Sequence, residues 1–400
     1  MKFLTPCLLT ASLLLTPGLP AVAIDYSVPH SGSPYQNLAA LEDHQILHLP
    51  TGVTVSVAQM IEIVAPSRVI YVGETHDNIE AHRAQLKVIR QMTQRFPGKI
   101  VVGMEMFRQS AQAELDQWHR GELTEKQFRK LFRHHWGPGY RLYQTIFDFM
   151  RTRNIPLLGL KSSRPAEQLL RDGGLHQTGL PEIDADDVHH KAYSMALFGG
   201  NDTHTDGVSQ PYQMLLLWEE SMAETVAGFL KDPTHADKKL IVLAGGFHVQ
   251  YGFGIPKRAF RRVPHAYSII LPVVTEIPED LKDREMKMAP VSIPLYIADF
   301  GWKLPYRVPP PKRIRLGIYL EEQEEGLRVT QVNKNSNGER MHLKVDDVIL
   351  QLDDRSLLDT EDLSDQLQTY DFGDRVRVRI LRDGVEIELQ GLLEKTEAAP

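Results

Sequence analysis

Four short runs of apolar and β-branched residues divide the first 250 residues of the chain, and polar residues follow each run at once. The runs cover residues 69–72, 100–103, 155–160 and 240–244. Between and beyond them, apolar residues recur with the spacing of helices over residues 78–96, 111–118, 125–132, 140–152 and 211–230. Strands that alternate with helices are typical of a parallel sheet whose faces are covered by helices. We therefore predict an α/β domain with a mainly parallel sheet.

One long stretch, residues 172–210, fits neither pattern and is rich in Gly, Asp and His. Long connections within a compact domain are usually functional, so we predict a helix-bearing cap or lid here. We expect its histidines, His189, His190 and His204, to be solvated. At the start of the first long helix, Asp77 or Asn78 is the expected N-cap, because its side chain can accept a hydrogen bond from a backbone N–H of the first turn.

Seven prolines between residues 277 and 311 mark a domain boundary, and residues 309–311 form a stiff proline linker. Beyond it, the pattern predicts strands over residues 317–320, 327–332, 345–350, 375–381 and 385–389, a turn at 335–338 and a helix over 360–368. These elements form a small β-rich domain. We place the α/β domain at residues 38–308, the β-rich domain at 312–394 and a tail at 395–400.

The first 23 residues have the features of a secretory signal peptide. Lys2 gives a positive start, a short apolar run follows, and Ala21-Val22-Ala23 is a small-residue cleavage site. We expect cleavage near Ala23, a secreted or periplasmic mature protein, and an N-terminal lead over residues 24–37. The surroundings of Cys7 make a poor lipid-attachment box, which argues against lipoprotein anchoring, and no run is long enough for a transmembrane segment.

The composition narrows the function classes. At 42% apolar, 24% charged and 8% aromatic residues, the chain is neither disordered, collagen-like nor a coiled coil. The net charge of −7, without a long basic block, argues against a nucleic-acid surface. Because Cys7 is the single cysteine and lies in the predicted signal peptide, we expect no disulfide, thiolate zinc site or cysteine nucleophile in the mature protein.

The candidate chemistry lies where the predicted strands end. Ligands of an open parallel sheet bind outside the carboxyl ends of its strands, so we expect Glu74, His76, Glu105, Lys161 and His248 to meet there. Such a cluster can hold a divalent metal through two histidines and a carboxylate. It can equally act without metal, with a glutamate as base and a histidine as acid.

A second group of residues is compatible with a porphyrin. His134, His135 and Trp136 precede a glycine-rich turn and Tyr140, while His82 lies one turn into the first long helix. Histidine or tyrosine can bind haem iron, and aromatic side chains can wall a porphyrin. The alternative is that the same aromatic residues simply belong to the core.

These motifs together resemble a known family. The two GxxH motifs that end at His76 and His248, with Met104-Glu105-Met106 and Ala298-Asp299-Phe300, resemble the ChaN-like family over about residues 38–308. That family is described as iron-regulated haem-binding proteins within the Tiki and erythromycin-esterase-like superfamily. In the wider superfamily such motifs form a metal-dependent protease or an esterase site, and the resemblance would place Glu74, His76, Glu105 and His248 in that site.

Residues 312–394 resemble a bacterial PDZ domain. The resemblance places its carboxylate-binding loop at Arg315, Leu316, Gly317 and Ile318. It implies that the loop holds the C-terminus of a protein or peptide, which is added as a strand to the neighbouring sheet edge. The acidic run over residues 321–325 argues against high affinity for acidic peptides.

Three hypotheses follow. The favoured one is an exported protein that binds haem, or a related tetrapyrrole, and carries a peptide-binding PDZ module. Iron uptake is one expected role, with storage and degradation of the ligand left open, and the iron ligand is open among His82, His134, His135 and Tyr140. The alternative is a hydrolase in which His76, Glu105 and His248 hold Zn, Mn or Co and Glu74 activates water. Thirdly, the α/β domain is an inactive scaffold and the PDZ domain does the work. Whether the chain forms a homodimer stays open.

Overall fold

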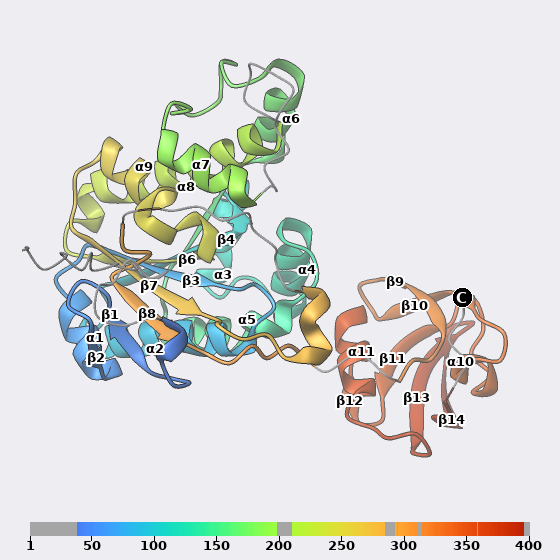
Figure 1. The fold of residues 1–400 in the computed structure, drawn as a ribbon. Helices are drawn as coiled ribbons and strands as arrows, with labels where there is room; N and C mark the ends of the chain where they lie inside the picture. The colour runs from blue at the N-terminus through green and yellow to red at the C-terminus, as the bar shows by residue number, and fades with distance from the viewer. Residues whose placement is uncertain are drawn as a thin grey trace, which may run out of the picture.

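The computed structural model describes residues 38–197, 210–284, 293, 295–309, 314–357 and 359–395. It contains two domains, an α/β domain and a smaller β-rich one (Figure 1). The predicted signal peptide, the N-terminal lead, His204, most of the proline linker and most of the tail lie outside the described residues. Among the residues described, no helix has the length and apolar character needed to cross a membrane.

The α/β domain is built on one eight-stranded sheet with the order β2-β1-β8-β7-β3-β6-β4-β5. Six neighbouring strands are parallel: β3 (Val69–Glu74), β4 (Ile100–Arg108), β5 (Leu157–Lys161), β6 (Lys239–Gly245), β7 (Tyr267–Val273) and β8 (Phe300–Lys303). Two short antiparallel strands, β1 (Ile46–His48) and β2 (Val53–Val55), close one edge. The mainly parallel α/β fold predicted from the sequence is confirmed.

Helices cover both faces of this sheet, because its central strands are apolar on both sides. One face packs against α1 (Val57–Val64), α2 (Ile79–Arg95), α3 (Gln112–His119), α4 (Glu125–His135) and α5 (Tyr140–Thr152). The other packs mainly against α8 (Gln210–Lys231) and α9 (Ile255–Arg262). The shorter α6 (Arg164–Gly173) and α7 (Val188–Leu197) lie on the α8 side (Figure 1). Asn78 is the N-cap of α2, as predicted, and its side chain accepts from Glu80 N.

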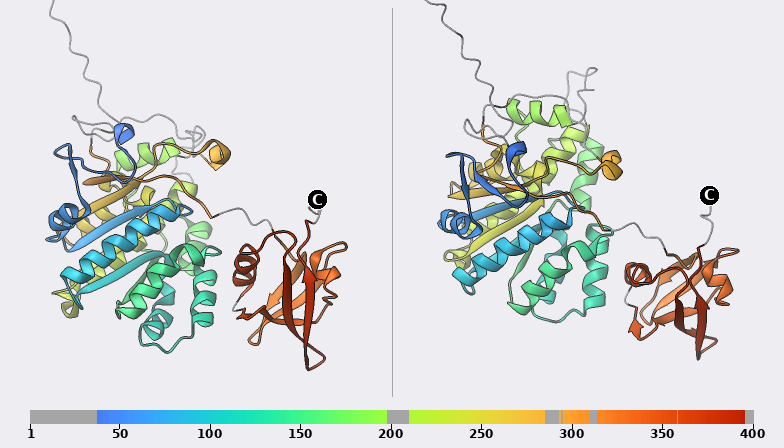
Figure 2. Two further views of the ribbon diagram at one scale, coloured as in Figure 1. Left: turned by 90° about the horizontal axis from the view of Figure 1, so that it is seen from below. Right: turned by 60° about the horizontal axis from the view of Figure 1, so that its bottom comes forward.

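The β-rich domain is an antiparallel sheet with its own core. Its main order is β14-β13-β11-β10-β9, from β9 (Ile318–Glu322), β10 (Leu327–Val332), β11 (Val348–Leu352), β13 (Arg375–Arg382) and β14 (Val385–Leu392), and β12 (Arg355–Ser356) pairs with β11. Two helices complete it, α10 (Asn337–Arg340) and α11 (Thr360–Leu367). The turn expected at 335–338 is the start of α10, which Ser336 caps. This domain sits beside α4 and α5 (Figure 2).

Candidate functional site at the strand ends

The carboxyl ends of β3, β4 and β6 meet at one edge of the sheet, and the predicted polar residues lie there. Glu74 at the end of β3 is in register with Gly245 at the end of β6. The sequence pattern predicts that the second strand ends before Glu105, but β4 continues to Arg108, so Glu105 lies within the strand. The structure thus brings together residues that are up to about 170 positions apart in sequence, and their chemical roles stay predictions.

Glu74 is a fully buried carboxylate that several side chains hold in place. Its Oε1 accepts from Tyr143 Oη at 2.5 Å and lies 2.7 Å from His76 Nδ1. Its Oε2 accepts from Gln85 Nε2 at 2.7 Å and lies 3.5 Å from His82 Nδ1. Burial alone would raise the pKa of Glu74. The charge of His82 and the hydrogen bond from His76 act in the opposite direction, and the net result is a lowered pKa. Glu74 is therefore an ionised anchor.

His76 is the exposed member of the Glu74–His76 pair, with 45% of its side chain accessible to solvent. Its ring meets Trp136 edge-on, at 4.9 Å between centroids. Burial lowers the pKa of His76, but the hydrogen bond to Glu74 and the charge of Glu105 raise it above its ordinary 6.5. Within the described part of the chain, Nδ1 is engaged by Glu74 and Nε2 holds no hydrogen bond. One ring nitrogen of His76 is thus fixed and the other is available.

Glu105 and His248 form a second, buried pair near His76. Glu105 Oε2 accepts from Gly245 N at 2.8 Å, and Oε1 lies 3.4 Å from His248 Nε2 and 3.7 Å from Lys161 Nζ. Burial disfavours both charges, yet their mutual attraction holds the pKa of Glu105 well below its usual range and raises the pKa of His248 to about 10. His248 is therefore a buried imidazolium at neutral pH.

A third carboxylate, Glu219 of α8, completes this network and has no signal in the sequence. Its Oε1 lies 3.2 Å from His248 Nδ1, and its Oε2 lies 2.8 Å from His190 Nε2 and 3.3 Å from Arg258 Nε. The side chain of His190 is only 1% exposed. The expectation that His190 is solvated is therefore wrong, because α7 packs it against Glu219 and Tyr212. The network ties α7 and α9 to the strand ends.

A pocket of about 550 Å³ opens at the ends of β3, β6 and β7. Glu74, His76, Gly245 and His248 contribute to its lining, together with the polar residues Thr75, Asp77, Gln250 and Thr275, the aromatic residues Tyr193, Phe247 and Tyr306, and the apolar residues Leu271 and Ile277. Tyr193 from α7 stacks on Phe247 with ring centroids 4.5 Å apart and an interplanar angle of 12°. The pocket therefore combines an aromatic wall with the available nitrogen of His76.

The predicted metal ligands do not form a metal-binding set. Among the residues that the structure describes, no group of three or more His, Asp, Glu or Cys side chains is arranged to hold an ion. The ring nitrogens of His248 face Glu219 and Glu105, at 3.2 and 3.4 Å. The His76, Glu105 and His248 set thus forms ion pairs and hydrogen bonds between its members and their neighbours.

The four predicted haem ligands, His82, His134, His135 and Tyr140, lie outside the pocket lining. His82 is buried, with Nε2 at 3.0 Å from the carbonyl of His76 and Nδ1 at 3.2 Å from Gln85 Oε1. Tyr140 stacks on Phe147 in the aromatic core. His134 is exposed at the end of α4. His135 beside it has a buried Nδ1 without a hydrogen bond in the described structure, and burial together with the charge of His134 lowers its pKa to about 4.

The predicted carboxylate-binding loop of the β-rich domain leads directly into β9. Gly317 has a φ of +71°, and a Cβ atom there would lie 2.4 Å from Cβ of Ser336, so only glycine fits. Asn337 Nδ2 donates to the carbonyl of Arg315 at 2.9 Å, and Gly338 N donates to the carbonyl of Leu316 at 2.7 Å. The loop is therefore held from α10, and β9 beyond it is an edge strand.

Comparisons with known proteins identify both domains. A family model described as "Haem-binding uptake, Tiki superfamily, ChaN" matches residues 60–259, and a PDZ domain model matches residues 315–391. Among solved structures, ChaN of Campylobacter jejuni, described with cofacial haem binding, is 16% identical; the match covers 65% of this chain and 96% of that one, with a TM-score of 0.48.

Two protease structures match the β-rich domain. The serine endoprotease from Yersinia pestis is 24% identical over 21% of this chain and 30% of its own, with a TM-score of 0.20. The HtrA-type protease AlgW with a decapeptide is 20% identical over 22% of this chain and 30% of its own, with a TM-score of 0.21. A search of curated protein sequences gives no match.

Proposed function

Because the chain belongs to the haem-binding uptake family of the Tiki superfamily and carries a PDZ domain, we propose that it binds haem in the strand-end pocket with His76 as the iron ligand. The observation that carries the proposal is the pairing of a half-exposed His76 with the buried carboxylate of Glu74, 2.7 Å from Nδ1. A bound haem would present an iron that accepts an axial donor.

The Glu74–His76 pair has the arrangement that is usual for a histidine that binds a metal. Histidine ligands usually give their second ring N–H to a carboxylate, which fixes the tautomer and raises the basicity of the ligating nitrogen. Here Nδ1 donates to Glu74, so the neutral ring has its lone pair on Nε2. Tyr143 and Gln85 hold the carboxylate from other directions and keep it from rotating.

The walls of the pocket suit a large flat ligand. Its volume of about 550 Å³ falls within the range of roughly 300–1,000 Å³ that is usual for small-molecule sites. The stacked Tyr193 and Phe247 offer aromatic surface on one side, and Leu271 adds apolar surface. Trp136, the C-cap of α4, lies edge-on to His76.

His76 is preferred to the other candidate ligands because of where those side chains lie. Both ring nitrogens of His82 have protein partners, and Tyr140 belongs to the aromatic core. His134 and His135 do not line the pocket. The hydrolase alternative is not favoured, since Glu105 and His248 are paired with each other and Glu74 is already engaged by its own donors.

We further propose that the protein acts outside the cytoplasm in haem or iron uptake, and that its PDZ domain recruits the C-terminus of a partner. The signal-like pattern of residues 1–23 supports export. The free edge of β9 behind the Arg315–Ile318 loop supports the addition of a peptide strand.

A haemin titration of the full chain, followed by visible absorption, tests haem binding in this pocket. We expect a saturable shift of the Soret band that Phe247→Glu abolishes, because the substitution puts a charge into the aromatic wall. The matched control is Phe260→Glu, which alters a 45% exposed phenylalanine on α9 outside the pocket lining. A linear response like that of an unrelated protein, or equal loss in both variants, would contradict the proposal.

A further inference from the structure

One helix of the haem-binding domain presents three cations to the PDZ domain. Lys126, Lys130 and Arg133 follow one another at intervals of four and three residues on α4, and so lie along one face of it. Lys126 Nζ donates to the carbonyls of Gln323 and Glu324, at 2.8 and 2.6 Å, just beyond the end of β9. This face of α4 therefore contacts the PDZ domain where β9 ends.

Arg133 contacts both elements that would flank a bound peptide. Its guanidinium forms an ion pair with Glu322, the last residue of β9, and Nη2 lies 3.1 Å from Oδ2 of Asp359, the N-cap of α11. Glu322 also accepts from the backbone and hydroxyl of Thr360, the first residue of α11. One arginine of the haem-binding domain thus bridges the edge strand and the helix beside it.

The helix α11 runs alongside the free edge of β9 in the opposite direction. At the loop end, Gln368 Nε2 donates to the carbonyl of Ile314 at 2.9 Å, and Ile314 N donates to Gln368 Oε1 at 3.3 Å. At the other end, Thr360 is bonded to Glu322. A peptide held by its carboxylate at the loop would therefore run antiparallel to β9 toward Glu322, and toward α4.

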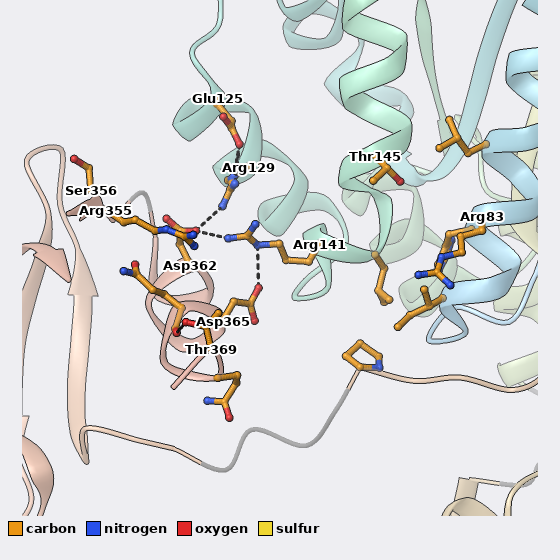
Figure 3. A pocket seen from close by; sticks show the side chains of 17 residues that line it. Arg83, Glu125, Arg129, Arg141, Thr145, Arg355, Ser356, Asp362, Asp365 and Thr369 are labelled. Atoms are coloured by element: carbon orange, nitrogen blue, oxygen red, sulfur yellow. Dashed lines mark hydrogen bonds and ion pairs between the residues drawn. The ribbon is translucent and has the colours of Figure 1, made fainter. Parts of the chain in front are cut away.

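Further contacts hold the two domains in this arrangement. Arg141 of α5 forms ion pairs with Asp362 and with Asp365, the latter at 2.9 Å between Nε and Oδ2. Arg129 of α4 lies 3.5 Å from Asp362 Oδ1, and Figure 3 shows both arginines pointing at the acidic face of α11. Gly139 N donates to Glu361 at 3.1 Å. The arrangement of α4 and β9 is therefore fixed by several elements.

A small pocket lies at the end of this path, between the two domains. Its volume is about 260 Å³, and it is lined by Lys126, Gln127, Lys130, Glu322, Gln323, Glu324 and Asp359. The five residues of β9 span about 17 Å at the usual rise of a strand. The peptide residues about four to six positions before the C-terminus would therefore enter this pocket, beside α4.

The acidic run at the end of β9 is partly neutralised in the structure. Glu321 is paired with Arg328 and Glu322 with Arg133, and Asp359 also contacts Arg133. In the part of the chain that the structure describes, Lys130 has no such partner. Against it stand Glu324 and Glu325, whose carboxylates are likewise unpaired there and belong to the bend that follows β9. Lys126 on the same face of α4 donates to carbonyl oxygens and has no carboxylate partner in the described residues, so α4 brings a second positive charge to the path of the peptide.

We propose that α4 forms part of the peptide site of the PDZ domain, and that the partner is a protein C-terminus with carboxylate side chains about four to six residues before its end. The inference rests on the proposed peptide binding and adds its specificity. It replaces the expectation, drawn from residues 321–325, that acidic peptides bind poorly. Lys130 supplies the attraction, and Arg133 shields the carboxylates that would repel such a peptide.

Selection from a displayed library of random heptapeptides with free C-termini, using the full chain as bait, tests the proposal. We expect enrichment of Asp and Glu in the first three library positions. For an acidic peptide so selected, Lys130→Glu should weaken binding about three- to fivefold, as for an exposed ion pair. Lys87→Glu, which reverses an exposed lysine on α2, should leave the affinity unchanged.

The outcomes separate this inference from the function on which it rests. Selected peptides without a charge bias, or a bias that survives Lys130→Glu, would overturn the role of α4 while leaving peptide binding in place. Failure to enrich any C-terminal sequence would contradict peptide binding itself, and with it the inference. Thermal unfolding of each variant shows whether a lost affinity reflects a lost fold.

Discussion

The imidazole of His76 is held by a carboxylate that does not reach solvent: Nδ1 lies 2.7 Å from Oε1 of Glu74, whose side chain is 0% exposed, while 45% of the His76 side chain is accessible. A buried partner fixes the ring in one tautomer and orientation more firmly than a solvated one could. This relationship is what turns an otherwise ordinary strand-end histidine into a candidate iron ligand.

Removing the charge of Glu74 should weaken haem binding while the size of this lining residue stays nearly the same. We expect Glu74→Gln to raise the haem dissociation constant about 10- to 100-fold, the range for loss of a partner that orients a metal ligand. Tyr143→Phe removes one donor to Glu74 but leaves the Glu74–His76 pair, so its effect should be smaller. Soret titrations of the two variants check this, and equal affinities for wild type and Glu74→Gln would contradict the assigned role.

Haem binding should depend on pH through His76. The pKa of His76 is raised above 6.5 by Glu74 and Glu105, against burial. The protonated ring therefore stabilises the ligand-free fold fully below pH 6.5, and that contribution is lost as the pH rises through the raised pKa. Because iron must displace this proton, affinity should fall on acidification by up to about tenfold per pH unit.

The measurement is the haem dissociation constant between about pH 5 and 9, in wild type and in His76→Ala. The variant should lose the pH dependence that belongs to His76, and this difference controls for the behaviour of haem itself. A wild-type affinity that does not vary with pH, or that rises on acidification, would contradict the assignment.

The buried network around Glu219 should be a major source of stability. Glu219→Gln removes the carboxylate between His248 and Arg258. It leaves these cations with Glu105 and Glu220, which also face Lys161 and Arg262, so buried positive charge is in excess. Breaking a buried pair in this way costs about 3–5 kcal/mol. The matched control is Glu224→Gln at an exposed position of the same helix, which should change the free energy of unfolding by less than about 0.5 kcal/mol. Urea unfolding of both variants measures the two losses of unfolding free energy. An equally small loss in both would contradict a stabilising role of the network.

A methyl group at Gly245 should disturb His76 more than the fold. An added Cβ would lie 3.0 Å from both Cε1 and Nε2 of His76. Gly245 has an ordinary φ of −50°, so alanine brings no backbone strain. We expect Gly245→Ala to lower haem affinity. The unfolding free energy should change by less than about 1 kcal/mol, because the half-exposed His76 ring can move away from the added methyl group. Gly228→Ala on the exposed face of α8, where a Cβ meets nothing within 4 Å, serves as the control.

Much of the fold follows from the sequence because its signals are local. The apolar runs that end at Gly73 and Gly245, and the cap at Asn78, are readable from neighbouring residues alone. The meeting of Glu74 and His76 with Glu105 follows from a general property of parallel sheets. By contrast, β7 and the short strands β1, β2 and β8 were not predicted; the short ones become strands only by pairing with one another or with β7.

The buried charges could not be predicted in the same way. Glu219 and Glu220 stand in the middle of a helix, where two adjacent acids usually indicate a solvated face. Their burial depends on Arg258, which lies 39 residues after Glu219 and 38 residues after Glu220. The contact of Arg133 with Glu322 likewise joins two domains. No local pattern reports such long-range pairs, and so the network and the domain interface emerge only in the folded chain.

The central claim is that His76 binds the iron, and haemin titration of His76→Ala beside wild type tests it most directly. The control is His134→Ala, which removes an exposed histidine outside the pocket lining. We expect a saturable Soret shift in wild type and in His134→Ala. In His76→Ala the affinity should fall at least about tenfold and the band should change, and added imidazole should partly restore both. An unchanged band and affinity in His76→Ala would contradict the central claim.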